Sequence, residues 1–190
     1  MQVRIAFAAA AALTLAGCTT TAGESTEVAE TVAVEDTARI TTDDYVAIQQ
    51  LYARYAHAID GLAMVGENPT PDASAEAYAD LFTEDGQIYV IGVHEEPIKG
   101  RQALTEFAMG HLENGPADNR HIITNPVLTL NADGTITGET QLMLVNMTTN
   151  PPTLVSNRAT KDTFVKTNDG WRLQWRNNSG ISNNTPFNRN

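Results

Sequence analysis

One amphipathic stretch, from residue 41 to residue 62 (TTDDYVAIQQLYARYAHAIDGL), constrains the fold more than any other part of the sequence. Its large apolar residues recur at steps of three and four, which at about 100° per residue places them on one helical face: Tyr45, Ile48, Leu51, Tyr52, Tyr55, Ile59 and Leu62. Thr42 is expected to cap this helix, and Asp43 and Asp44 suit the positive end of its dipole. Another part of the fold must cover so wide an apolar face.

Asp60 is the unusual residue of this helix. It follows the apolar face near the C-terminal end, where the helix dipole disfavours an anion and Gly61 offers a stop. A carboxylate in this place either reaches solvent or points into a cavity that the helix helps to wall.

Length and charge limit the class of protein. A chain of 190 residues that is 42% hydrophobic suits one domain with appendages. The net charge of -11 and the pI of about 4.6 exclude nucleic acid as a partner, because no basic stripe is present to neutralise phosphates. Anionic lipid surfaces would repel the same charge, and strongly anionic substrates would need a local Arg or Lys.

The first 17 residues are typical of an export signal, with Arg4 followed by an apolar run too short for a durable membrane span. The sequence Leu15-Ala16-Gly17-Cys18 resembles the lipobox of bacterial lipoproteins. This resemblance implies cleavage before Cys18, the only cysteine of the chain, and a lipid anchor on it. Because Thr19 follows, it implies the outer membrane in a Gram-negative host. An ordinary secretory signal with an incidental cysteine is the alternative.

The remaining sequence divides into a tether, a domain and a tail. Residues 18–40 begin with the lipidated Cys18 and then lack helical or strand periodicity, which indicates a disordered tether. The folded domain is expected over 41–182, followed by a polar C-terminal tail over 183–190. Within the domain, the loop 63–74 contains Gly66, Pro69 and Pro71 and is long enough to form a lid.

Helical patterns come first in the domain and strand patterns follow. Ser74 is expected to cap a short helix ending at Phe82, Gly86 to turn the chain, residues 87–93 to form a strand, and 100–114 to form a third helix. The second half alternates with period two and predicts four hairpin-linked strands: 121–130, 135–147, 157–167 and 171–182. This order predicts an α+β fold with helices on one face of a curved antiparallel sheet.

Five segments, in order, carry a resemblance to a known family: YARYAHAID, YADLFTEDGQIYV, IKGRQAL, NRHIITNPVL and TFVKTNDGWRLQWR. Over about residues 41–182 they resemble SnoaL-like domains of the nuclear transport factor two-like superfamily. The resemblance implies a cone formed by a bent sheet wrapped on three helices, and a homodimer packed through its sheets. The same cone hosts dehydratases, isomerases, cyclases, other lyases and plain binders.

His121 and Asp60 are the main candidates for chemistry. By period two, His121 shares its strand face with Ile123, Asn125 and Val127. Taken alone, it could be a core histidine satisfied by one hydrogen bond. In scytalone dehydratase-like members, however, a histidine on this strand faces an aspartate at the end of the first helix, and His121 and Asp60 match those positions. The resemblance therefore implies that Asp60 orients His121, which acts as acid or base.

Other residues could assist this pair. Tyr52 and Tyr55 could donate hydrogen bonds to a substrate oxygen, as a phenol does in ketosteroid isomerase, which has a related cone, or could be core aromatics. Asn125 is a second polar candidate for substrate binding. On the last strand Trp171 and Trp175 alternate with Arg172 and Arg176; inward tryptophans are the default, while the family pattern points to Arg176.

No metal and no cofactor are expected. His57, His94 and His111 are scattered, without the spacing of a metal motif, and no glycine-rich phosphate loop is visible. Scytalone dehydratase looks to use a second histidine, and here only His121 is well placed by sequence.

Three functions remain open. The first is a cofactor-free lyase or isomerase that acts by proton transfer on a small, apolar and aromatic or polycyclic compound. The second is a lipid-anchored protein that binds a hydrophobic molecule without catalysis. The third is an assembly protein of the envelope whose cone is filled by side chains.

Overall fold

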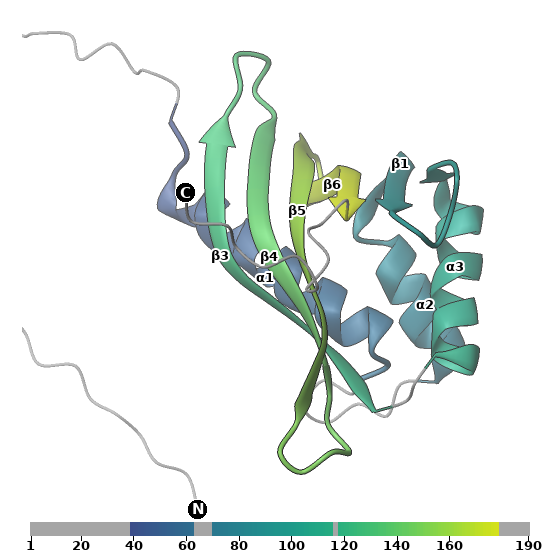
Figure 1. Cartoon of the computed structure of the whole chain (residues 1–190). Coiled ribbons are helices and arrows are strands. Elements are labelled where there is room, and N and C mark those ends of the chain that lie inside the picture. Colours follow the sequence, from purple (N-terminus) through teal and green to yellow (C-terminus); the bar gives the residue numbers. More distant parts are fainter. Residues whose placement is uncertain (1–38, 63–69, 116–117, 179–190) are drawn as a thin grey trace, which may run out of the picture. The chain divides into compact units, whose positions relative to one another are not determined.

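The computed structural model describes residues 39–62, 70–115 and 118–178 (Figure 1). Contacts divide the chain into a unit of Met1–Asp36 and a second of Thr37–Asn190, which contains all described residues. The leader, almost all of the tether, most of the loop and the tail therefore lie outside the described residues. Every residue of the buried core lies between Ile48 and Leu173, so a chain beginning at Thr37 retains the whole core and is expected to fold on its own.

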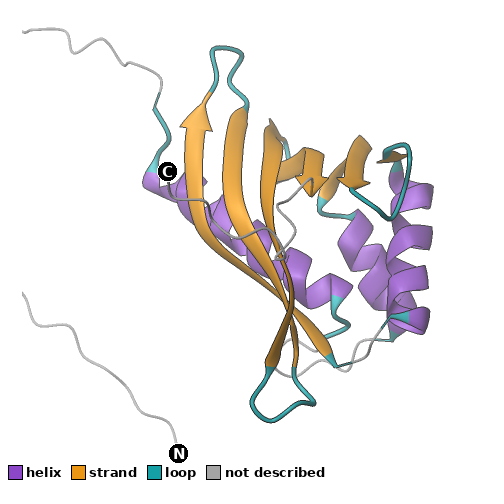
Figure 2. Cartoon of the chain, viewed as in Figure 1, coloured by secondary structure: helices purple, strands orange, loops and turns teal. Residues whose placement is uncertain are grey.

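Three helices and six strands make up the described part of the second unit, and no helix there is long and apolar enough to cross a membrane. In chain order they are α1 (Thr42–Ile59), α2 (Pro71–Ala79), β1 (Phe82–Val90), β2 (Ile98–Lys99), α3 (Arg101–Asn114), β3 (Asn119–Leu130), β4 (Ile136–Asn146), β5 (Thr153–Thr167) and β6 (Gly170–Asn178). The strands form one open sheet in the order β2-β1-β6-β5-β4-β3. Figure 2 shows the long strands curving across α1, with α2 and α3 grouped at the β1 side. The predicted α+β fold is confirmed.

Helix α1 buries most of the face that its periodicity predicts, but Tyr45 at its start is 42% exposed. Ile48, Tyr52, Tyr55 and Ile59 are at most 3% exposed and belong to the core. The predicted cap was wrong by one residue. Thr41 is the cap: its hydroxyl accepts from the Asp44 amide, and the Asp44 carboxylate accepts from the Thr41 amide.

The region after α1 differs from the prediction. Helix α2 begins at Pro71 with Thr70 as its cap, because proline fits the first turn, where a helix needs no amide donor. Ser74 is buried inside α2 and caps nothing. Gly86 is not a turn but part of β1. A side chain there would come within 2.7 Å of the Phe82 Cβ, so glycine permits the close approach.

The four antiparallel strands β3 to β6 pair as predicted, but β1 adds a feature that the sequence pattern missed. It pairs in parallel with β6 and antiparallel with the short β2, which makes the sheet mixed. Since β1 and β6 lie about 90 residues apart along the chain, no hairpin signal could reveal this pairing. Helix α3 between them matches its prediction within one residue.

Candidate functional site

Asp60 and His121 meet where α1 ends and β3 begins. The Nδ1 atom of His121 lies 2.6 Å from Oδ1 of Asp60, and the His121 amide donates to Oδ2 at 2.8 Å. Both carboxylate oxygens of Asp60 therefore contact His121, one at the ring and one at the amide, which fixes the position of the imidazole relative to the backbone. The Asp60 side chain is 1% exposed and that of His121 is 12% exposed. The carboxylate is sealed, while the ring still reaches the surface.

The end of α1 explains why the carboxylate faces inward. Asp60 is the C-cap residue, and Gly61 then adopts a φ of 61°, a conformation that glycine favours. An added Cβ at Gly61 would lie 3.0 Å from the Leu112 side chain of α3, so the chain is closely packed here. The helix dipole and burial both disfavour a negative charge on Asp60. The two hydrogen bonds from His121 compensate for this cost.

His111 lies beside this pair, which the sequence did not predict. The ring of His111, in the last turn of α3, is 5.5 Å from the His121 ring between centroids, in an edge-on arrangement. Burial lowers the pKa of His111, the charge of His121 lowers it further, and Asp60 partly opposes the shift. The expectation that only His121 is well placed among the histidines was wrong. His111 lies ten residues before His121 and on a different element, so no sequence spacing predicts their contact.

The same three residues could hold a metal ion. Asp60, His111 and His121 each offer one ligand atom, and these atoms lie within 4.8 Å of one another. A zinc ion would need each of the three ligand atoms about 2 Å away, so these atoms would have to lie closer together. Both Asp60 oxygens already accept from His121, so a metal would have to displace at least one of these bonds. The hydrogen-bonded arrangement suits proton transfer better than metal binding.

Tyr52 and Tyr55 are buried inside the domain, on the face of α1 that the sequence predicts. Burial raises the pKa of Tyr52, and the nearby Asp162 charge adds to the shift, so the phenol remains a hydrogen-bond donor. The Tyr55 ring lies 4.0 Å from the Arg176 guanidinium carbon, in cation–π geometry.

Arg176 is completely buried and bonds to an equally buried partner. Its Nη1 atom donates to Oδ2 of Asp162 at 3.0 Å, and neither side chain has any exposed surface. Within the described part of the chain, Nε and Nη2 of Arg176 find no hydrogen-bond partner. Arg176 therefore faces the interior, as the family pattern suggested.

The default expectation of inward tryptophans on the last strand holds for Trp171 and was wrong for Trp175. Trp171 is buried, but Trp175 is only half-buried, on the sheet face opposite Arg176. The cause is a shift in the pairing of β6 with β5: Thr163 pairs with Trp175, and the next residue, Phe164, pairs with Leu173. The extra residue of β6 inverts the alternation, so Trp171 and Arg176 both point inward.

Asn125 does not share a face with His121, contrary to the expectation from period two. The pairing of β3 with β4 shifts between Thr124 and Val127, and Asn125 adopts a φ of 53° within this irregularity. Its side chain is exposed and contacts Thr124 and Gln141. The bulge also turns Val127 outward, where it is 63% exposed. Nothing in this geometry favours a role for Asn125 at the site.

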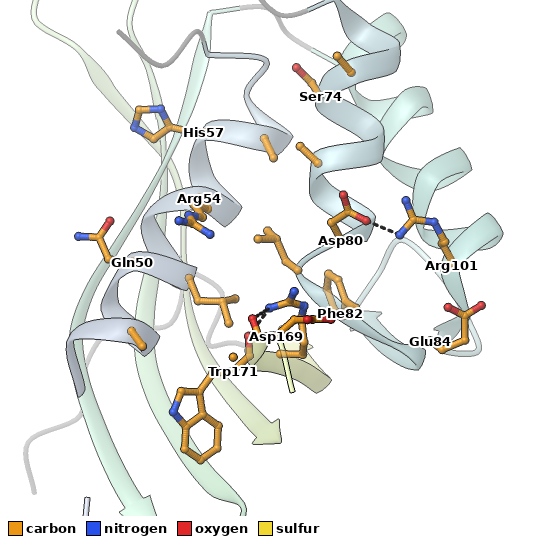
Figure 3. Close-up of a pocket in the computed structure, with 18 of the residues that line it drawn as sticks. Gln50, Arg54, His57, Ser74, Asp80, Phe82, Glu84, Arg101, Asp169 and Trp171 are labelled. Carbon is orange, nitrogen blue, oxygen red and sulfur yellow. Dashed lines mark hydrogen bonds and ion pairs between the residues drawn. The ribbon is translucent and has the colours of Figure 1, made fainter. Parts of the chain in front are cut away.

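One hollow among the described residues is lined by neither Asp60 nor His121. It has a volume of about 1300 Å³ and opens between α1, α2 and the β5–β6 turn (Figure 3). Arg54 and His57 line it on one side. On the other, Arg101 bridges Asp80 and Glu76. Since both acids are more than half exposed, these ion pairs are surface features of little energetic weight.

Comparison with known proteins agrees with this fold. The family description "SnoaL-like domain" matches residues 40–177. No curated protein matches the chain.

Solved structures extend the likeness. An NTF2-like protein with a cystatin-like fold from Novosphingobium aromaticivorans is 26% identical, with a TM-score of 0.61 over 76% of this chain and 85% of that one. A protein of unknown function from Mycobacterium tuberculosis is 25% identical, with a TM-score of 0.59 over 73% and 72%. ActVI-ORFA from Streptomyces coelicolor, 21% identical with a TM-score of 0.57 over 72% and 96%, shares the fold.

Proposed function

The chain belongs to the SnoaL-like family, and from this premise we propose that it is a cofactor-free enzyme that catalyses proton transfer on a small molecule. The observation that carries the proposal is the double contact of Asp60 with the ring and the amide of His121. A histidine that merely fills a core needs one hydrogen bond, whereas this one is held by a sealed carboxylate and keeps part of its ring exposed.

The roles follow from the atoms. Asp60 accepts the Nδ1 proton, fixes that tautomer and stabilises the imidazolium, which leaves Nε2 to take a proton from the substrate. His111 has a lowered pKa, so it is neutral near pH 7 and does not repel the imidazolium that forms. It can act as a second hydrogen-bonding group on the same substrate.

The reaction class is an elimination, an aldol-type cleavage or an isomerisation. In an elimination, Nε2 removes a proton from the carbon beside a carbonyl, the electron pair forms the new double bond, and hydroxide leaves with a proton from the imidazolium, as water. Each of these reactions needs one acid or base and one donor to the developing oxyanion. His111, whose ring centroid lies 5.5 Å from that of His121, is near enough for the second role. Tyr52 is not, because its hydroxyl lies against Gly138, six residues along β4 from the Leu144 that pairs with His121.

The substrate is proposed to be small, apolar and aromatic or polycyclic, because the interior of the domain contains a group of aromatic side chains in mutual contact, including Tyr55, Tyr78 and Phe82. We further propose that Cys18 carries a lipid that anchors the protein to the cell envelope, and that the domain is a homodimer.

The test uses residues 37–190 with a panel of aromatic alcohols, diaryl compounds and hydroxy ketones, followed by product mass. Wild type is compared with Asp60→Asn and His121→Asn, and with His57→Asn as the matched control, because His57 lines the separate hollow. We expect turnover in wild type and His57→Asn, and a loss of at least about 100-fold in the two site variants. A loss of water, an unchanged mass or a loss of a carbon fragment would identify the reaction.

A non-catalytic binding protein is the second candidate, because the hollow of about 1300 Å³ is lined by neither Asp60 nor His121. It predicts that the panel binds equally to wild type, Asp60→Asn and His121→Asn, with no turnover in any of them. That result would refute the catalytic proposal.

A further inference from the structure

The hairpin that joins β4 to β5 has an unusual composition. From Thr140 to Asn157 it contains no charged residue and no histidine, although the whole chain carries 35 Lys, Arg, Asp and Glu residues. At its end, Met147, Leu154 and Val155 are 51%, 47% and 50% exposed. We call these three side chains the hairpin tip. Figure 1 shows this hairpin projecting at the end of the sheet away from the β3–β4 turn.

The backbone of the hairpin explains why two neighbouring apolar residues are both exposed. Val145 pairs with Leu154, while Leu144 pairs with Ser156, so Val155 is an extra residue in β5. Normal alternation would send one of Leu154 and Val155 into the core. The bulge instead leaves both at the surface, next to Met147 on the other strand.

Several polar groups of the turn bond to one another. The Asn146 side-chain oxygen accepts from the amide and the hydroxyl of Thr148, and the hydroxyls of Thr149 and Thr153 bond to each other. Pro151 and Pro152 carry no amide donor. These features reduce the number of hydrogen bonds to water that are lost when this turn enters a less polar medium.

We propose that the hairpin tip inserts into the headgroup region of a lipid bilayer. An acidic protein is repelled by anionic membranes, but an uncharged projection with exposed apolar side chains can enter the interface. The turns that join β3 to β4 and β5 to β6 contain Asp133 and Asp169, so they are poorly suited to this contact. This contact would act together with the anchor proposed at Cys18.

The chain outside the described residues is long enough for this arrangement. The start of α1 lies near Leu128, at the end of β3 opposite His121, and the helix is about 27 Å long at 1.5 Å per residue. The 21 residues from Cys18 to Ala38 can extend to about 70 Å. An anchor at Cys18 therefore lets the end of the domain that carries the hairpin tip, opposite the start of α1, reach the bilayer.

The hairpin also connects the membrane with the candidate site. His121 pairs with Leu144, which pairs with Ser156, so the site lies about 10 Å along the strands from Met147. An apolar substrate dissolved in the bilayer would then enter from the membrane side. This last step rests on the proposed function, whereas insertion of the tip does not require catalysis.

The first experiment labels the tip in residues 37–190, which contain no native cysteine. Leu154→Cys and Val127→Cys each carry an environment-sensitive fluorophore; Val127 is equally apolar and exposed but lies towards the other end of β3. With vesicles of neutral phosphatidylcholine, we expect a blue shift at position 154 and none at 127. No shift at 154, or equal shifts at both positions, would overturn the proposal.

The second experiment measures vesicle flotation and oligomeric state. Changing Met147, Leu154 and Val155 together to Ser should weaken vesicle binding by at least about tenfold, while Val127→Ser should not change it. Unchanged binding by the triple variant would overturn insertion. The proposal would also be overturned if wild type did not bind vesicles but formed a dimer that the triple variant does not form. The hairpin tip would then be an interface between two copies of the chain. Neither readout depends on turnover, so failure of the proposed catalysis remains distinguishable.

Discussion

The pair of Asp162 and Arg176 provides the sharpest test of the energetics of this fold. Both side chains are completely buried, and they contact each other through Oδ2 and Nη1 at 3.0 Å. Asp162→Asn would leave Arg176 charged in the core with only the rings of Tyr55 and Tyr52 near it, at 4.0 and 5.7 Å. Removal of one partner of a buried ion pair costs about 3–5 kcal/mol. For a domain whose total stability is about 5–15 kcal/mol, this is a large fraction.

Arg176→Met should behave differently, because the remaining group can lose its charge. Burial raises the pKa of the Asp162 carboxyl, and Arg176 opposes this shift. Without Arg176, the folded-state pKa rises further above the unfolded value. The folded protein then binds the proton more tightly, so stability is retained at low pH and is lost as the pH rises through the folded pKa. Replacement of both residues, Asp162→Leu with Arg176→Met, should cost less than Asp162→Asn alone.

Urea unfolding of residues 37–190 measures these effects. With a slope of about 1–3 kcal/mol per molar, Asp162→Asn should lower the midpoint by at least about 1 M. Glu139→Gln is the matched control, because Glu139 pairs with Lys161 at 3.6 Å on the surface, and should cost under about 1 kcal/mol. A cost for Asp162→Asn no larger than that of the control, or a double variant as unstable as the sum of its single variants, would refute this reasoning.

Three further predictions concern single positions. The lowered pKa of His111 means that the unfolded state binds more protons than the folded state below about pH 6.5. Wild type should therefore lose stability between pH 7 and 5, and His111→Asn should lose less. Equal pH slopes of stability in the two proteins would contradict this. Lys166 chiefly lowers the pKa of Asp44, so the contribution of this carboxylate to stability is fully present above about pH 4 and is lost progressively on acidification; Asp44→Asn should therefore lower the melting temperature less at pH 2 than at pH 7. Gly138→Ala should destabilise by about 1–3 kcal/mol, because its Cβ would lie 2.4 Å from the Tyr52 hydroxyl, whereas Gly110→Ala meets nothing within 4 Å and should be neutral or stabilising.

Local patterns were sufficient to predict most of the elements. The three- and four-residue spacing of α1 identified most of its buried face. Turns with glycine located the β3–β4 and β5–β6 hairpins, and Pro151 and Pro152 separated β4 from β5. The parallel pairing of β1 with β6 was missed, since it depends on contacts between distant segments. The start of α2 was missed because Pro71 was treated as a helix breaker, although proline is tolerated in the first turn.

The candidate site shows a sharper limit of sequence patterns. Period two correctly placed His121 and failed for Asn125 and Trp175, each of which lies beside or beyond a shift in strand pairing. A bulge is determined by the hydrogen bonds of two strands together, so one strand's sequence does not reveal it. His111 was missed for a similar reason, because only the packing of α3 against the start of β3 brings it to His121.

The two buried carboxylates of the domain have different consequences for function. Asp162 and Arg176 are both fully enclosed, so this pair contributes to the stability and specificity of the fold. The Asp60 side chain is almost as enclosed, at 1% exposed, but its partner His121 remains 12% exposed. A binding protein would gain nothing from a carboxylate that bonds both the ring and the amide of a partly exposed histidine. Because this arrangement lowers the cost of forming an imidazolium at the surface of the domain, proton transfer is the function that best accounts for it.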